Sequence, residues 1–137
     1  MINRVYLDSL PSQPNIFNVN LGVGERVVFT AKLKMFGTEK GELLGTGANL
    51  KFTLTNHTLF AQNPYGIWTA DLYDDVVSFV LDDRSVLFIR NVFFPVTLNK
   101  EIIFANGTRR LRGFQFYFNK KDTERLNLII KGIMYTL

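Results

Sequence analysis

The chain has 137 residues, which fits one domain with a core large enough to need no disulfide staples. It contains no Cys, which excludes a disulfide framework and a thiolate metal site. The formal net charge of +4 is compatible with an anionic lipid surface, nucleic acid or an acidic protein face, although most small domains use such a charge for solubility.

Residues 1–23 are predicted to be an N-terminal extension, in which the segment from Val5 to Leu10 forms a short strand or helix that packs on the domain. Pro11–Asn15 has the composition of a turn or linker. The first residues lack the apolar stretch of a signal peptide, and no apolar run approaches the roughly 20 residues that a membrane-spanning helix needs. We therefore expect a cytoplasmic protein.

Residues 24–137 are predicted to form the domain itself, and its first half reads as strands. Alternating apolar residues predict a first strand over Arg26–Phe36. Phe36–Gly47 contains four glycines after its first residue and is expected to be a long connection. Leu50–Ala61 alternates on both sides of Asn56 and His57, which predicts a hairpin with a positive-φ turn at that pair.

The second half of the domain continues the strand pattern. Further strands are expected over Ile67–Tyr73, Val86–Phe94, Glu101–Ala105 and Leu111–Phe118, with Pro95 ending the second of these and Asn106-Gly107 forming a turn. The run Val92–Val96 shows no alternation, so it is either a buried strand end or an exposed patch for a partner, and burial is favoured. Phe114, Phe116 and Phe118 share one face and are expected in the core.

The last residues change from a strand period to a helix period. Apolar residues recur at helical spacing and form one stripe: Leu126, Ile129, Ile130, Ile133, Met134 and Leu137. Asn119 or Asp122 is expected to cap this helix. The chain therefore reads as mainly β, with about seven strands followed by one C-terminal helix.

Three motifs in this order resemble GRAM domains, which belong to the pleckstrin-homology (PH-like) superfamily. They are the Gly24-Glu25 step before the first strand, the Leu54-Thr55-Asn56 hairpin and the acidic-Val-Ser step that ends at Ser78. The resemblance, of bacterial type, covers roughly 25–137. It implies a bent antiparallel sandwich or barrel capped by the helix, in a protein that binds a partner and does not catalyse.

No cluster of catalytic residues is recognisable in the sequence. His57 is the only histidine and reads as a solvated turn residue. The acidic pairs Asp74-Asp75 and Asp82-Asp83 lie at expected turns, and adjacent strand residues point to opposite faces. We therefore expect no enzyme, no cofactor and no metal site.

Basic residues form two candidate contact sites. Lys32, Lys34, Lys40 and Lys51 flank the expected first loop, where PH domains gather a lipid headgroup, and they would contact anionic lipid or an acidic partner. Arg109, Arg110 and Arg112 form a second basic patch beside the Asn106-Gly107 turn. Solubility is the simpler interpretation of this patch.

Two functions remain open at this point. The first is docking to a protein partner or self-assembly, and the second is weak peripheral binding to anionic membrane lipid through the four lysines. Nucleic acid is not expected, because the Phe-rich strand is assigned to the core and is not free to stack bases. A lipocalin-like barrel that encloses an apolar ligand is the alternative fold.

Overall fold

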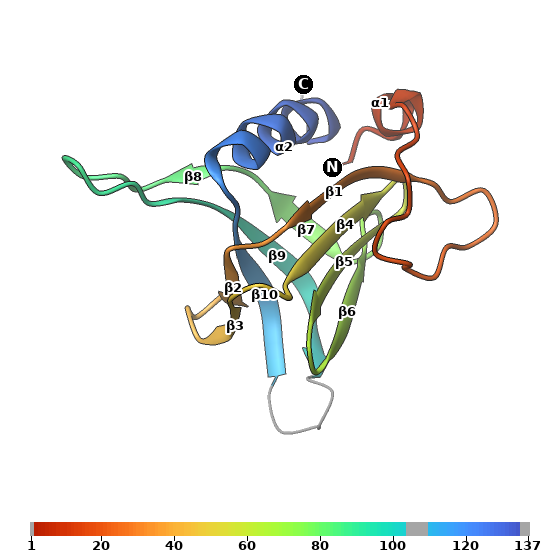
Figure 1. Cartoon of the computed structure of the whole chain (residues 1–137). Helices are drawn as coiled ribbons and strands as arrows, with labels where there is room; N and C mark the ends of the chain where they lie inside the picture. The colour runs from red at the N-terminus through yellow and green to blue at the C-terminus, as the bar shows by residue number, and fades with distance from the viewer. Residues whose placement is uncertain (1, 104–109, 135–137) are drawn as a thin grey trace.

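The computed structural model describes residues 2–103 and 110–134, and these form ten antiparallel strands and two helices (Figure 1). The elements are α1 (Arg4–Ser9), β1 (Val27–Lys32), β2 (Met35–Thr38), β3 (Leu43–Thr46), β4 (Lys51–Thr55), β5 (Thr58–Asn63), β6 (Gly66–Asp71), β7 (Val76–Phe79), β8 (Asp82–Asp83), β9 (Val92–Ile103), β10 (Arg110–Tyr117) and α2 (Lys120–Ile133). One sheet has the order β1-β4-β5-β6, and the other has the order β3-β2-β10-β9-β7 with β8 paired to β9.

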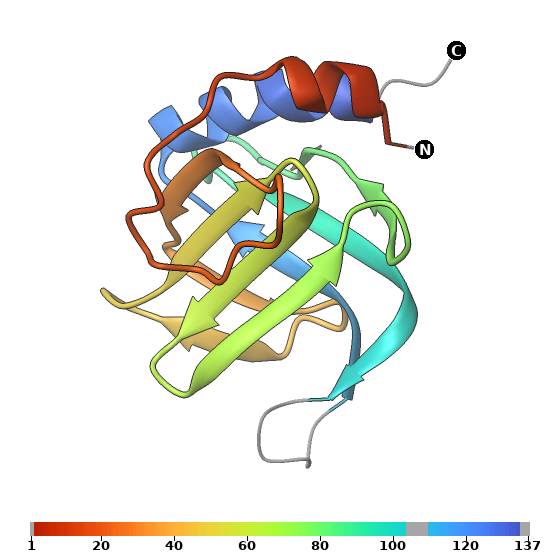
Figure 2. The ribbon, with the colours of Figure 1, turned by 90° about the vertical axis from the view of Figure 1, so that its right-hand side faces the viewer.

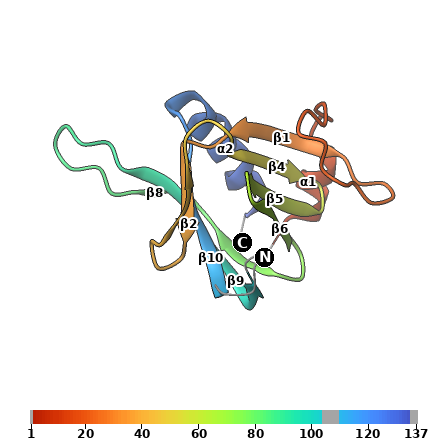
Figure 3. The same cartoon turned by 60° about the horizontal axis from the view of Figure 1, so that its bottom comes forward.

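The prediction of a mainly β chain that ends in a helix is confirmed. The strand number is higher than expected for two reasons. The predicted first strand bends at Leu33 and Lys34 and divides in two, and the short strands β3 and β8 form where a connection and a turn were expected. Its first half, β1, pairs with β4 in one sheet, while its second half, β2, pairs with β3 and β10 in the other. At this bend the chain passes from one sheet to the other, and Figures 1 and 3 show the change in direction.

The predicted long connection Phe36–Gly47 is wrong, because β2 and β3 form a tight hairpin there. Gly37 was interpreted as a loop residue, but it lies inside β2. A Cβ at Gly37 would stand 2.7 Å from the Glu42 carbonyl oxygen, so the glycine permits a close backbone approach across the hairpin. The Thr38 hydroxyl accepts hydrogen bonds from the N–H groups of Lys40 and Glu42 and stabilises the turn.

The hairpin β4–β5 is confirmed, but the predicted positive φ at its turn is wrong. Neither Asn56 nor His57 has a positive φ. The Thr55 hydroxyl accepts hydrogen bonds from the N–H groups of His57 (3.0 Å) and Thr58 (2.7 Å) and holds the turn. Asn56 links this turn to the start of β1, because its Oδ1 accepts from the N–H of Arg26.

The space between the two sheets is filled by aromatic side chains. Phe52 is fully buried, and its ring makes edge contacts with the rings of four other residues: Phe29, Phe79, Phe116 and Phe118. Phe114, Phe116 and Phe118 are all buried, as predicted. Edge-to-face ring pairs each add about 0.5–1.5 kcal/mol beyond burial, so this cluster is a main source of stability.

Helix α2 covers one end of this aromatic core (Figure 1). Asn119 is the N-cap, and its side chain accepts a hydrogen bond from the N–H of Asp122 at 2.8 Å. The predicted stripe is confirmed by the burial of Leu126, Ile130 and Ile133, while Leu137 lies outside the described residues. No described helix is long and apolar enough to cross a lipid bilayer.

The N-terminal segment packs against both α2 and the first sheet. It forms helix α1, in agreement with one of the two predicted forms, and Leu7 on that helix is fully buried. Asn3 donates its backbone N–H to the Ile133 carbonyl at 2.6 Å, and Gln13 donates to the Val27 carbonyl at 2.7 Å. Figure 2 shows the segment after α1 crossing the outer face of the β1-β4-β5-β6 sheet.

Replacing Gly132 by alanine is expected to destabilise the protein, because the added methyl group would overlap the Tyr6 ring of α1. Overpacking of this kind costs about 1–3 kcal/mol, whereas alanine alone would favour the helix by about 1 kcal/mol. In urea unfolding, Gly132→Ala should therefore lower the free energy of unfolding of the natural chain. The same substitution should raise it when Tyr6 is already alanine. Equal gains in both backgrounds would contradict the α1–α2 packing.

The predicted strand Val86–Phe94 is also wrong. Strand β9 begins at Val92 and runs on to Ile103, through Pro95. Pro95 pairs with Gln115 on one side, and on its other side the partner of β9 changes from β7 to β8. Proline has no backbone N–H to donate to a neighbouring strand, and Pro95 lies where the pairing on this side of β9 is interrupted. Phe93, Phe94 and Val96 are buried, which confirms burial of the run Val92–Val96.

A closed lipocalin-like barrel is contradicted by the two separate sheets that the described residues form. The β1-β4-β5-β6 sheet ends at β6, and the other sheet ends at β3 and β7. Phe rings occupy the interior between the sheets. The described chain is therefore a two-sheet sandwich with a filled core.

Candidate functional site

The four lysines assigned to the first contact site separate into different places. Lys32 and Lys51 are cross-strand partners in β1 and β4, and the Lys51 ammonium lies 5.7 Å from the centre of the Phe17 ring. Lys34 lies at the bend between β1 and β2. Lys40 lies in the β2–β3 turn, separated from Lys34 by the length of β2. The four do not form one cluster.

The second basic patch is partly neutralised by an acidic neighbour. Arg110 at the start of β10 forms an ion pair with Glu101 at 3.2 Å. Arg112 is exposed on the same strand. Arg109 lies outside the described residues. Exposed ion pairs of this kind contribute little to stability, and the pairing reduces the positive charge that Arg110 offers to a partner.

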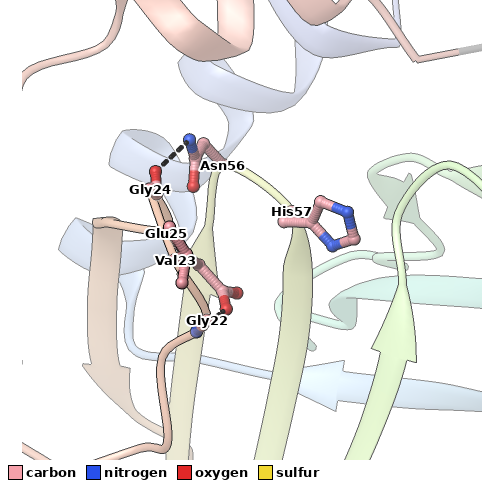
Figure 4. Close-up of a pocket in the computed structure, with 6 residues that line it drawn as sticks. All are labelled: Gly22, Val23, Gly24, Glu25, Asn56 and His57. Atoms are coloured by element: carbon pink, nitrogen blue, oxygen red, sulfur yellow. Dashed lines mark hydrogen bonds between the residues drawn. The ribbon is translucent and has the colours of Figure 1, made fainter.

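A hollow lies beside the β4–β5 turn, lined by Gly22, Val23, Gly24, Glu25, Asn56 and His57 (Figure 4). Burial opposes ionisation of Glu25 and would raise its pKa. Hydrogen bonds from the Gly22 N–H and from the side chains of Thr55 and Thr58 outweigh burial, so the pKa of this carboxyl is lowered. Glu25 is thus a structural acceptor for the turn and stays ionised. Figure 4 shows the His57 ring directed away from Glu25.

His57 has a partner of its own. Its Nδ1 lies 3.1 Å from an Asp71 carboxylate oxygen, and its ring packs edge-on against Tyr73. Asp71 also accepts hydrogen bonds from the N–H groups of Tyr73 and Asp74 and so organises the turn after β6. Within 2–103 and 110–134, no group of three or more His, Cys, Asp or Glu side chains could hold a metal ion. His57 is therefore a structural residue of this turn.

The most exposed apolar surface lies on a hairpin that projects from the body of the protein, between β8 and β9 (Figures 1 and 3). We call residues 84–91 the projecting hairpin. Four consecutive apolar side chains occupy its tip: Val86 (65% exposed), Leu87 (94%), Phe88 (102%) and Ile89 (72%). Single exposed apolar residues are common on protein surfaces, but four in a row at the end of a projection indicate an interaction site.

The backbone of this tip is ordered and internally satisfied. Val86 and Ile89 exchange two hydrogen bonds, of 3.0 and 2.9 Å, which closes a two-residue turn around Leu87 and Phe88. Leu87 has φ +53°, and Phe88 does not have a positive φ. This pattern matches a type II′ turn, whose first central residue is normally glycine. A leucine there is strained by about 1–2 kcal/mol, so an apolar side chain is retained at the tip at a conformational cost.

The base of the projecting hairpin is fixed by polar and aromatic contacts. Arg84 donates its backbone N–H to the Asn91 carbonyl at 2.7 Å, and the Asn91 N–H donates to the Ser85 hydroxyl at 3.0 Å. The Arg84 guanidinium lies over the Phe93 ring and pairs with Asp82 at 3.1 Å. Phe93 in turn stacks on Tyr117 of β10 with ring centres 5.1 Å apart. The hairpin is thus a supported projection.

The projecting hairpin is not predicted from the sequence, because the pattern over Val86–Phe94 indicates a strand. A continuous apolar run is ambiguous, since a buried strand and an exposed tip contain the same residue types. The sequence did contain one indication: Arg90-Asn91 places two polar residues inside the predicted strand Val86–Phe94, between two apolar runs.

Comparison with known proteins finds no matching family model, no matching curated protein and no matching solved structure. The projecting hairpin and the basic residues around it therefore carry the functional argument alone.

Proposed function

We propose that this chain is a non-catalytic, cytoplasmic binding module of PH-like, GRAM-type architecture that attaches peripherally to anionic membranes by inserting the tip of its projecting hairpin. The observation that carries the proposal is the run of four exposed apolar side chains from Val86 to Ile89 at the end of an ordered projection. Exposing these apolar side chains to water is unfavourable, so moving them from water into the lipid lowers the free energy.

The energy available from the tip suits reversible attachment. Burying one Val, Leu, Ile or Phe side chain contributes about 1.5–3 kcal/mol. Insertion of Leu87 and Phe88 alone would therefore supply about 3–6 kcal/mol. The paired N–H and C=O groups of Val86 and Ile89 reduce the cost of bringing the backbone into the lipid interface, where unpaired backbone groups are expensive.

The charges on the hairpin are ordered in a way that favours an anionic surface. Arg84 and Arg90 lie directly behind the apolar tip, while Asp82 and Asp83 lie farther back along β8. The two residues from Phe88 to Arg90 span about 7 Å. An apolar element that inserts into the interface goes about 5–10 Å deep, so the arginines would then lie at the level of the lipid headgroups.

The resemblance to GRAM domains supports a binding function, and the order of two bent sheets followed by a capping helix agrees with it. The proposed contact differs from the one that the resemblance implies. Lys32, Lys40 and Lys51 lie away from the tip, and of the four lysines only Lys34 shares a hollow with a residue of the projecting hairpin. The lipid contact is therefore assigned to the projecting hairpin, with Lys34 at its base.

Sedimentation with liposomes tests this function. The natural chain should bind vesicles containing anionic lipid more strongly than neutral vesicles, and binding should weaken as salt rises. The variant Leu87→Ser/Phe88→Ser is expected to lose about 100-fold or more in membrane partitioning, since about 3 kcal/mol of burial is removed. The matched control is Leu128→Ser, which removes an exposed leucine from α2 and should leave binding unchanged.

A second variant separates membrane contact from folding. Leu87→Gly relieves the strain at φ +53° and should leave the melting temperature unchanged or raise it, while it weakens membrane partitioning. Binding by the Ser/Ser variant that equals binding by the natural chain would overturn the proposal. Loss of a dimer in light scattering for that variant, with no vesicle binding by the natural chain, would instead assign the tip to a second copy of this protein.

A further inference from the structure

A hollow with two basic residues lies at the base of the projecting hairpin. It is lined by Lys34, Met35, Arg90, Asn91, Val92, Tyr117 and Phe118 and has a volume of about 280 Å³. Its wall combines three parts of the fold: the bend between β1 and β2, the hairpin arm that enters β9, and the end of β10. No residue of this hollow takes part in the turn network around Glu25 and His57.

The two cations of the hollow are available to a ligand. The ion pairs in the described part of the chain involve other basic residues: His57, Arg84, Lys100, Arg110 and Arg125. The charge of Arg90 acts on Asp83, whose pKa is lowered first by hydrogen bonds from Ser85 and then by Arg90. Asp83 is fully exposed, so solvent screens this attraction. Lys34 and Arg90 each have no carboxylate within ion-pair distance among the described residues.

The position of these cations is set by the backbone. The Lys34 N–H donates to the Tyr117 carbonyl at 2.8 Å, which fixes the bend against β10. Asn91 is held by its two backbone hydrogen bonds to Arg84 and Ser85, which leave its side-chain amide free to donate to a ligand. The residues that line the hollow thus include one with a guanidinium fork, one with an ammonium group and one with a side-chain amide.

We propose that this hollow is a subsite for a phosphate monoester, and that its natural source is the headgroup of an anionic lipid in the membrane that the hairpin tip enters. This inference rests on the proposed membrane attachment. A phosphate monoester carries close to two negative charges and three acceptor oxygens at neutral pH. Arg90 binds two of these oxygens in a bidentate manner, and Lys34 supplies a second, compact charge.

The geometry of insertion brings a lipid phosphate to this hollow. Asn91 follows Phe88 by three residues, which is about 10 Å along an extended strand. When Leu87 and Phe88 enter the apolar boundary, the hollow therefore lies at the depth of the headgroup phosphates. A free phosphate compound has the same chemistry but does not gain from the tip, so it binds the hollow without depending on Leu87 or Phe88.

The test compares vesicles that contain phosphatidate with vesicles that contain phosphatidylglycerol at matched surface charge. Phosphatidate presents a phosphate monoester, whereas phosphatidylglycerol presents a diester. The natural chain is expected to bind the monoester vesicles about tenfold more tightly, and Lys34→Gln/Arg90→Gln should abolish this preference while it retains tip-dependent binding. Lys32→Gln/Lys51→Gln removes the same charge elsewhere and should keep the preference.

The outcomes separate this inference from the proposed function. If both double variants lose the same affinity, or if the natural chain shows no preference, the subsite is overturned while membrane attachment stands. If Leu87→Ser/Phe88→Ser still binds vesicles as the natural chain does, membrane attachment itself fails. Inorganic phosphate provides the last arm: displacement from phosphatidate vesicles only at millimolar phosphate supports the lipid source. If micromolar phosphate displaces the protein and this does not depend on Leu87 or Phe88, the hollow binds a soluble phosphate compound and the lipid source is overturned.

Discussion

Ile130→Asp is expected to leave the chain unfolded or aggregated. Ile130 lies on the inner face of α2 and is only 2% exposed, within the same core as Phe52. An aspartate there would have to bury a carboxylate without a partner or expose the end of the core that α2 covers. Either result costs several kcal/mol, which is a large part of the roughly 5–15 kcal/mol by which a domain is stable. Circular dichroism and light scattering of the purified variant would show the loss.

The matched control for this change is Leu128→Asp. Leu128 is two residues away on the same helix and is 70% exposed, so it is directed to solvent. We expect a melting temperature within a few degrees of the natural protein, since surface substitutions usually change stability by less than about 0.5 kcal/mol. If Ile130→Asp unfolds no more readily than Leu128→Asp, the placement of α2 over the core is wrong.

Phe52→Ala is expected to lower the free energy of unfolding by about 3–5 kcal/mol. The Phe52 ring contacts four other aromatic rings between the two sheets, with centre distances from 5.1 to 6.4 Å. Truncation removes the burial energy of the ring and leaves a cavity that these rings can only partly fill. Urea unfolding monitored by the fluorescence of Trp68, which is buried, would measure the change.

The control for this substitution is Phe88→Ala at the tip of the projecting hairpin. It removes the same side chain from a site that is fully exposed, so the free energy of unfolding should be unchanged or slightly higher. Equal losses for the two variants would mean that the tip is packed against the protein in solution. That result would also remove the basis for membrane insertion.

The sequence predicts the fold where a periodic pattern has one structural meaning. The alternation in β4, β5 and β10 and the helical stripe in α2 predicted the correct elements. The stripe of α2 matches one buried face, whereas β4 and β5 are buried on both faces although their sequences alternate. The pattern failed at Gly37 and Gly45, where glycine lies within strands. There it permits close approach, to the Glu42 carbonyl and the Leu50 side chain respectively. The sequence alone does not distinguish such a glycine from a flexible one.

The candidate site was harder to predict than the fold. The four lysines are dispersed because β1 and β2 bend into different sheets, and a bend at Leu33 and Lys34 has no glycine or proline to mark it. Lys34 and Arg90 are far apart in sequence, and only the pairing of β2 with β10 and of β10 with β9 brings them to one hollow. Local patterns carry no information on such long-range proximity.

The hydrogen bond from Asn3 to Ile133 has a consequence for the order of folding. It joins residues from nearly opposite ends of the sequence, so forming it closes a loop that contains both sheets. Contacts with such large sequence separation form late, because the entropy of loop closure is lost before the contact is made. The sheets and α2 are therefore expected to assemble first. Helix α1, with one buried side chain, can then detach and return while the rest of the protein stays folded.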